Sequence, residues 1–312
     1  MTQSEFASQL QRYGPQREGL GRATLEEARQ YCAQLARTHY ENFTVGSCLL
    51  SKPLKQHFFN VYAYCRWADD LADEIQQPEQ AEELLNWWQT QLSDCYGGQS
   101  WHPVFVALRE TIDEFDIPIN PFQDLLIAFR RDQQQNRYST FSELREYCRH
   151  SANPVGHLVL FLGGSYNSGN VELSDHICTG LQLANFWQDV CRDFRRGRIY
   201  LPRETITQYN CEEAEFQMGR ATMAFRQALE HEVARAEQML KWGLPLVERV
   251  DRSIRLEVDI FVHAGLAVLN AIRQCDFDVW SERPTIGRMT KVRLLSGAIR
   301  RRWLSRVMRG GQ

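Results

Sequence analysis

The chain has 312 residues, of which 43% are hydrophobic, enough for one large core or for two domains. No apolar run approaches the roughly 18 residues that a membrane-spanning helix needs. The N-terminus has neither the basic start nor the apolar stretch of a signal peptide, so we expect a cytoplasmic protein. Nine cysteines without a CxxC pair indicate reduced thiols rather than a disulfide framework or a zinc site.

Helical spacing dominates the chain from end to end. Apolar residues recur at intervals of three and four, while the alternating runs typical of strands are short and few. The clearest helical stretches are residues 25–35, 58–72, 81–92, 229–240 and 258–272. Glycine and proline separate these stretches, and no repeat or flexible linker divides the chain. We therefore predict a single all-α domain that spans residues 1–312.

The first polar stripe lies in VYAYCRWADDLADE, residues 61–74. Tyr62, Arg66, Asp69 and Asp73 step by four, three and four, so a helix would place them on one face. Such an i,i+4 aspartate pair is common on solvated helices and carries little weight alone.

Further along, Asn153-Pro154 interrupts a helical pattern, because proline removes a backbone donor. Two interpretations stay open. Either a kinked helix lets a ligand approach the backbone at Gly156, or a new helix begins here with proline in its first turn.

The second polar stripe lies in LQLANFWQDVCRDFRRGRIYLP, residues 181–202. Gln182, Asn185, Asp189 and Asp193 again share one helical face. If the two helices faced each other, their aspartate pairs would form an acidic cleft for hard divalent cations. This cleft is our organising hypothesis for the site.

Such a cleft suits Mg²⁺, which binds through one or two carboxylates and completes its shell with water and phosphate oxygens. A diphosphate held there becomes a good leaving group without any nucleophilic side chain. The chain has no P-loop, GxSxG or GxGxxG motif, and no suitably placed Glu-x-x-His pairs for a di-iron bundle. A carbocation formed in the cleft would need an apolar, aromatic lining. Candidates for this lining are Phe43, Tyr62, Phe129, Tyr147, Phe161, Phe186 and Tyr200.

Together, the two stripes resemble the squalene and phytoene synthase family, and the resemblance covers residues 35–295. It implies the α-helical isoprenoid synthase fold, with the two aspartate helices facing across a central cavity. It implies four catalytic aspartates: Asp69, Asp73, Asp189 and Asp193. The implied ligands of Mg²⁺, or alternatively Mn²⁺, are these four with Asp70 and Asn185. The implied substrate contacts are Phe43, Tyr62, Arg66, Tyr147, Gln182, Asn185, Gln188, Arg198 and Tyr200.

The match is closer to one branch of the family, the HpnC-type hydroxysqualene synthases of squalene and hopanoid biosynthesis. HYENFTVGSCLL (39–50), FDIPINPFQDLLIAFRRDQ (115–133) and YCRHSANPVGHLVL (147–160) carry this resemblance. It implies ionisation of presqualene diphosphate, rearrangement, and capture by water to give hydroxysqualene and diphosphate. The step needs no NADPH, and other enzymes of the squalene pathway are the implied partners. No nucleic acid partner is expected.

One departure from the family pattern stands beside the second aspartate pair. Many members carry an arginine just before it, where this chain has Gln188. The replacement removes one positive charge from the diphosphate end, which is compatible with a different substrate. Gln188 is therefore the residue that bears most directly on which diphosphate is ionised.

The C-terminal segment, residues 288–312, holds eight lysines and arginines and no acid. Val292, Leu295, Ile299, Trp303 and Val307 would share one helical face among those arginines. Two interpretations stay open: an interfacial helix on anionic lipid at the inner membrane face, or a helix packed on the domain.

Two other functions stay open. The first keeps the fold but condenses two prenyl diphosphates head to head, giving presqualene diphosphate, squalene or phytoene. The second is a non-catalytic lipid-binding or assembly factor, which would have no reason to keep all four aspartates.

Overall fold

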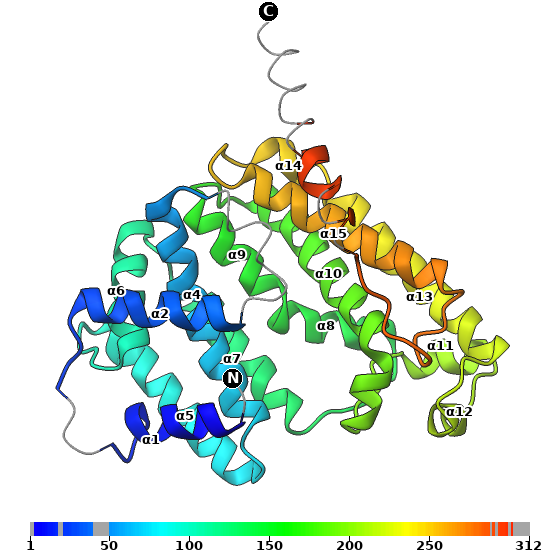
Figure 1. Cartoon of the computed structure of the whole chain (residues 1–312), viewed down its shortest axis with the longest axis horizontal. Coiled ribbons are helices and arrows are strands. Elements are labelled where there is room, and N and C mark those ends of the chain that lie inside the picture. Colours follow the sequence, from blue (N-terminus) through cyan, green and yellow to red (C-terminus); the bar gives the residue numbers. More distant parts are fainter. Residues whose placement is uncertain are drawn as a thin grey trace, which may run out of the picture. The chain divides into compact units, whose positions relative to one another are not determined.

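The computed structural model describes residues 3–17, 21–39, 50–287, 289–290, 293–298 and 301. Within these ranges the regular structure is helical, and the sole β-type pairing is an isolated bridge between Arg137 and Ile199 (Figure 1). The all-α prediction is confirmed. Each of the five predicted helical stretches falls inside an observed helix.

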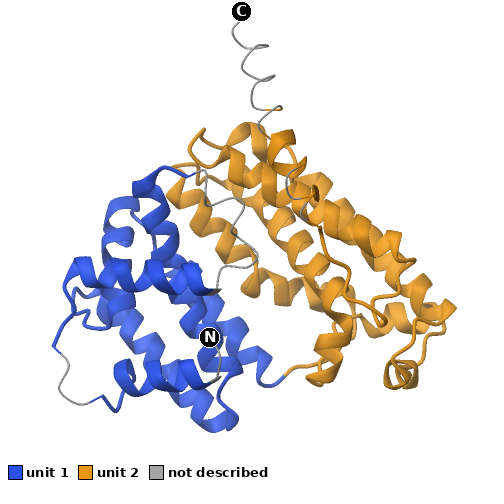
Figure 2. Ribbon diagram, in the orientation of Figure 1, with its two compact units in different colours: residues 1–44, 50–134 blue, residues 45–49, 135–312 orange. Residues whose placement is uncertain are grey.

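The chain forms two compact units (Figure 2). Unit 1 comprises residues 1–44 and 50–134, and unit 2 comprises residues 45–49 and 135–312. The single domain spanning residues 1–312 stays a prediction.

The described helices of unit 1 are α1 (Gln3–Tyr13), α2 (Leu25–His39), α4 (Lys52–Asp73), α5 (Pro78–Tyr96), α6 (Pro103–Phe115) and α7 (Asn120–Asp132). Its core is aromatic. Trp67 of α4 stacks on Trp88 of α5 with 5.3 Å between ring centroids. The Trp67 indole N–H donates to the Tyr31 hydroxyl at 2.9 Å, and the Tyr64 hydroxyl donates to the Phe122 carbonyl at 2.9 Å. These contacts fix which face of α4 is buried.

Between residues 135 and 274, the helices of unit 2 are α8 (Phe141–Ser151), α9 (Asn153–Leu162), α10 (Ser168–Arg195), α11 (Arg203–Gln208), α12 (Glu213–Met218), α13 (Met223–Gly243), α14 (Leu246–Arg249) and α15 (Arg255–Gln274). The long helix α10 packs against α13, α15 and α9. Gly180 and Gly243 let α10 and α13 approach closely. A Cβ added at Gly180 would lie 2.8 Å from Leu240, and one at Gly243 would lie 2.7 Å from the Leu173 carbonyl oxygen.

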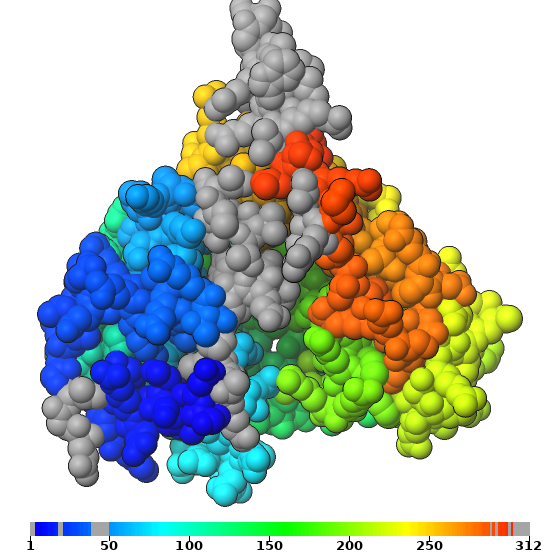
Figure 3. Space-filling view, in the orientation of Figure 1, coloured from blue at the N-terminus to red at the C-terminus, as the bar shows by residue number. Residues whose placement is uncertain are grey.

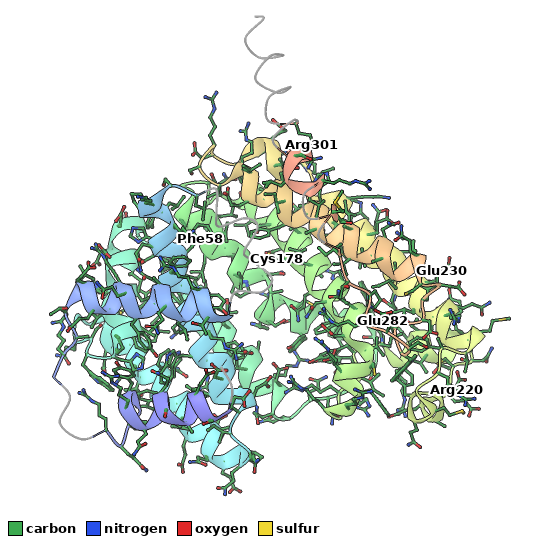
Figure 4. The ribbon with its side chains drawn as sticks, in the orientation of Figure 1. Phe58, Cys178, Arg220, Glu230, Glu282 and Arg301 are labelled. Atoms are coloured by element: carbon green, nitrogen blue, oxygen red, sulfur yellow. The ribbon has the colours of Figure 1, made fainter. Side chains whose placement is uncertain are left out.

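The Asn153-Pro154 step is a helix start. The helix α8 ends at Ser151, and α9 begins at Asn153 with proline in its first turn. The Asn153 side chain is buried and accepts a hydrogen bond from the Thr179 hydroxyl at 3.1 Å. A Cβ at Gly156 would lie 2.5 Å from the sulfur of Cys178, which Figure 4 labels on α10. The second of the two sequence interpretations is therefore confirmed, and Gly156 serves the packing of α9 on α10.

The sequence predicts a chain without membrane-spanning helices and with reduced cysteines. Among the described residues, no helix combines the length and the hydropathy that crossing a bilayer requires. The eight cysteines in the described ranges are free thiols, as the sequence predicts.

Candidate active site

The first polar stripe forms as the sequence predicts. Residues 62, 66, 69 and 73 all belong to α4, and Asp73 is its last residue. The neighbouring Ala63, Trp67 and Leu71 are fully buried in the core of unit 1. Burial of that opposite face leaves Tyr62 and Arg66 half-buried and Asp73 exposed.

Arg66 is held by its neighbour along the helix. Its Nε donates to Asp70 Oδ2 at 3.0 Å, and a second guanidinium nitrogen bonds the other oxygen of the same carboxylate. Asp70 is only 1% exposed. Asp69 lies farther from the same guanidinium, at 3.5 Å from Nη1. The two adjacent aspartates therefore have different surroundings. Asp70 is a buried partner of Arg66, whereas Asp69 keeps 44% of its side chain exposed.

Like charges gather around Asp69. Although part of the Asp69 side chain reaches solvent, the surrounding protein removes much of the hydration of its carboxylate. This loss of hydration and then repulsion from Asp73 raise the pKa of Asp69 from 3.8 to about 7. Asp70 and Asp132 add to this repulsion, and Arg66 opposes it. Asp132 is the last residue of α7, whose end is tied to α4 by a hydrogen bond from Gln133 Nε2 to the Ala72 carbonyl at 2.7 Å. Sequence reasoning missed Asp132, because it lies far from the stripe along the chain.

The second polar stripe also forms as predicted, on α10 of unit 2. Gln182 and Asp193 are half-buried and Asn185 is exposed, while Asp189 has 13% of its side chain exposed. Asp193 also stabilises the turn that follows α10. Its backbone carbonyl accepts hydrogen bonds from the backbone N–H groups of Arg196 at 3.0 Å and Arg198 at 2.9 Å.

An arginine from beyond α15 reaches this stripe. Arg283 Nε lies 2.6 Å from Asp189 Oδ1, and Arg283 Nη2 lies 2.8 Å from Asp189 Oδ2. The same Nη2 donates to Gln188 Oε1 at 2.9 Å, and Gln188 Nε2 donates to the Pro284 carbonyl. The segment that brings Arg283 runs over the surface of unit 2 beside the C-terminal part of α10 (Figure 3), and Figure 4 labels the preceding residue, Glu282.

Arg283 is the neighbour of the second stripe that sequence reasoning missed most clearly. It lies 94 positions from Asp189, and no local motif marks it. The sequence placed Gln188 at the diphosphate end of the stripe. In the structure Gln188 is 7% exposed and its side chain faces the 283–284 segment.

An aromatic cluster lies beside the second stripe. Phe186 of α10 stacks on Tyr200 at 3.7 Å between ring centroids, and Tyr147 of α8 lies 6.1 Å from each of them. Tyr138, which sequence reasoning did not single out, stacks on Tyr200 at 5.8 Å. All four rings are buried. A small pocket brings Asp193, Arg198, Tyr200 and Phe186 together.

The donor set fits a hard divalent cation. Each stripe presents carboxylates one helical turn apart, and oxygen donors of this kind are what Mg²⁺ and Mn²⁺ select. A bound cation would offset the like charge that gathers around Asp69. In the described ranges, no group of three or more acidic, histidine or cysteine side chains is arranged to enclose a metal. Two carboxylates for each ion, with water and phosphate completing the shell, suit such an open arrangement.

Two predictions fall wholly or partly outside the described residues. Phe43 lies outside them, as does most of the basic segment 288–312. Residues 293–298 are helical, and Leu295 and Ala298 pack against Leu256 and Ile260 of α15. Arg301 bonds both oxygens of Asp259 at 2.8 and 3.1 Å, as Figure 4 helps to locate. The beginning of the basic segment is thus packed on unit 2, and binding of the remainder to a membrane stays a prediction.

Comparison with known proteins identifies the family. The squalene/phytoene synthase family model matches residues 36–290. The chain is 29% identical to phytoene synthase from Arthrospira platensis, over 88% of this chain and 93% of the relative. It is 28% identical to 15-cis-phytoene synthase from Synechococcus elongatus, over 86% of this chain and 91% of the relative.

Solved structures agree with the family match. Squalene synthase HpnC from Alicyclobacillus acidocaldarius is 38% identical, with a TM-score of 0.78, over 81% of this chain and 95% of that chain. A dehydrosqualene synthase with bound ligand is 25% identical, with a TM-score of 0.82, over 90% of this chain and 98% of that chain. The isoprenoid synthase fold predicted from the sequence is confirmed. The chain belongs to the squalene/phytoene synthase family of enzymes, which act on prenyl diphosphates and condense them head to head.

Proposed function

We propose that this protein ionises presqualene diphosphate and that water captures the rearranged cation, releasing hydroxysqualene and diphosphate. The observation that carries the proposal is the pair of aspartate stripes on α4 and α10, each with a nearby arginine. The 38% identity to the HpnC structure supports the branch of the family from which this substrate is taken. In this proposal the aspartates of both stripes serve to bind the metal ions that accompany the diphosphate.

Asp69 and Asp73 on α4, and Asp189 and Asp193 on α10, would hold Mg²⁺ or Mn²⁺, with Asn185 contributing an amide oxygen. When bound, the metal supplies positive charge that stabilises the diphosphate as it leaves. Asp70 holds the Arg66 guanidinium in place, since both of its oxygens are bonded to it. Arg66 and Arg198 would contact diphosphate, and Gln182 lies on the same face as the α10 acids.

The reaction itself needs no protein nucleophile. The carbon–oxygen bond breaks, its electron pair leaves with diphosphate, and a cyclopropylcarbinyl cation remains. Tyr147, Phe186 and Tyr200 offer buried aromatic rings beside the α10 stripe, which stabilise positive charge and exclude water until rearrangement is complete. Water then adds to the rearranged cation and loses a proton. Tyr62 and Phe43 complete the proposed lining.

A condensing enzyme is the second candidate. The observation that favours it is the identity of 28–29% with two phytoene synthases over more than four-fifths of the chain. Such an enzyme would use the same aspartates but would join two prenyl diphosphates. The site residues are therefore the same in both candidate functions. The two candidates differ in the substrate that the protein consumes.

The test is product identification without a reductant. The purified protein is incubated with Mg²⁺ and, separately, farnesyl, geranylgeranyl or presqualene diphosphate in ¹⁸O-labelled water. We expect turnover of presqualene diphosphate alone, with ¹⁸O in the hydroxyl group of the product. Consumption of farnesyl or geranylgeranyl diphosphate as sole substrate would establish the condensing candidate instead. Asp69→Asn and Asp189→Asn serve as inactive controls, and unchanged turnover in both would show that catalysis does not depend on these stripes. Absence of turnover with all three diphosphates would favour a non-catalytic lipid-binding or assembly factor.

A further inference from the structure

The contacts of Asp189 differ from those of Asp69. The Arg283 guanidinium forms a bidentate pair of hydrogen bonds with the Asp189 carboxylate, and both bonds are shorter than 3 Å. Only 13% of the Asp189 side chain is exposed. Asp69 lies 3.5 Å from a guanidinium whose hydrogen bonds go to another carboxylate. Parallel bonds between arginine and carboxylate are stronger and more directional than a single charged contact. An internal cation therefore already occupies Asp189 in this structure.

Gln188 fixes that cation in place. Its amide oxygen accepts from Arg283, and its amide nitrogen donates to the carbonyl of Pro284, so one buried side chain holds both the guanidinium and its backbone. The segment around Arg283 has no regular secondary structure, and residues 282–287 lack helical hydrogen bonding of their own. Gln188 therefore adds to the bonds with Asp189 that hold Arg283 in position. An arginine at position 188 would repel Arg283 instead of accepting its hydrogen bond.

We propose that Arg283, positioned by Gln188, is an internal counter-ion that competes with the divalent cation for Asp189, so that a metal binds there only by exchanging the guanidinium. The inference rests on the proposed metal role of the α10 stripe. It makes Gln188 and Arg283 positioning residues that set how strongly the second aspartate pair binds metal. The same ion pair offsets repulsion between Asp189 and Asp193 in the metal-free protein.

The experiment measures binding of Mn²⁺ alone, by electron paramagnetic resonance of free Mn²⁺, in an Asp69→Asn/Asp73→Asn background that removes the α4 pair. Adding Arg283→Met should tighten Mn²⁺ binding about tenfold, because the competing two-pronged bond is gone. Gln188→Met, which keeps the size of the side chain, should tighten it by a smaller factor. Arg283→Lys should fall between Met and wild type, since lysine keeps the charge but not the fork.

Arg192→Met is the matched control. Arg192 Nη1 lies 3.5 Å from the same Asp189 oxygen, but its side chain is 64% exposed and makes no two-pronged bond. Its removal deletes the same charge near the same carboxylate and should change Mn²⁺ affinity by less than about threefold. Equal effects of Arg192→Met and Arg283→Met, or no tightening with Arg283→Met, would overturn the inference.

Asp189→Asn in the same background separates this inference from the proposed function. If it leaves Mn²⁺ binding unchanged, Asp189 holds no metal, and the counter-ion inference fails together with the proposed metal role of Asp189. If it abolishes binding while Arg283→Met changes nothing, only the counter-ion inference fails. Thermal unfolding of each variant checks folding, and Gln188→Met and Arg283→Lys carry the test should Arg283→Met not fold.

Discussion

Replacing Asp70 by asparagine separates a structural aspartate from a metal-binding one. The carboxylate is 1% exposed and accepts two hydrogen bonds from Arg66, whose own side chain is 24% exposed. Breaking a buried ion pair costs about 3–5 kcal/mol, and a hydrogen bond to a charged group contributes about 1.5–3 kcal/mol. Asparagine keeps one acceptor oxygen, and Arg66 can regain some water. We therefore expect Asp70→Asn to lower the free energy of unfolding by about 2–3 kcal/mol.

The assay combines urea unfolding with hydrogen exchange of peptides from α4, which reports the local loss directly. Asp73→Asn is the control, because this exposed residue ends the same helix and its replacement should cost less than about 0.5 kcal/mol. Mn²⁺ affinity is measured in parallel and should change little in Asp70→Asn. Unchanged stability together with a loss of Mn²⁺ affinity as large as that of Asp69→Asn would refute this reasoning and establish Asp70 as a metal ligand.

Three further predictions concern the stability of the two units. Relative to wild type, Asp69→Asn should raise the free energy of unfolding of the metal-free protein by a growing amount as the pH rises from about 4 to about 7. The reason is that the raised pKa of Asp69 makes its charged form unfavourable in the folded protein. Urea unfolding at several pH values that shows no such trend would contradict this. Gly243→Ala should cost about 1–3 kcal/mol, since its Cβ would lie 2.7 Å from the backbone oxygen of Leu173, and an unchanged melting temperature would show that α10 and α13 separate freely. The Asp259 carboxylate raises the pKa of His263 through a hydrogen bond. His263→Gln should therefore lower the free energy of unfolding by its full amount below pH 6.5, and by less as the pH rises through the raised pKa. A loss of stability that does not vary with pH in chemical unfolding would exclude this ion pair as the cause.

The sequence by itself determined the helices and the two stripes. Spacing of three and four decides which residues share a helical face, and the buried tryptophan and alanines of α4 leave Tyr62, Arg66, Asp69 and Asp73 on the other side. This is a local property of the chain, so it could be predicted without tertiary structure. The family resemblance rested on those same stripes, and the family match confirmed it.

Tertiary structure decided which partner each acid has. Asp69 and Asp70 are adjacent in sequence, but only burial of Asp70 against Arg66 shows that their surroundings differ. Asp189 receives an arginine from 94 residues away, and Gln188 faces that arginine. Such contacts depend on how distant segments pack, which helical periodicity does not encode. The missing charge at position 188 was visible in the sequence, whereas the guanidinium of Arg283 beside it required the folded chain.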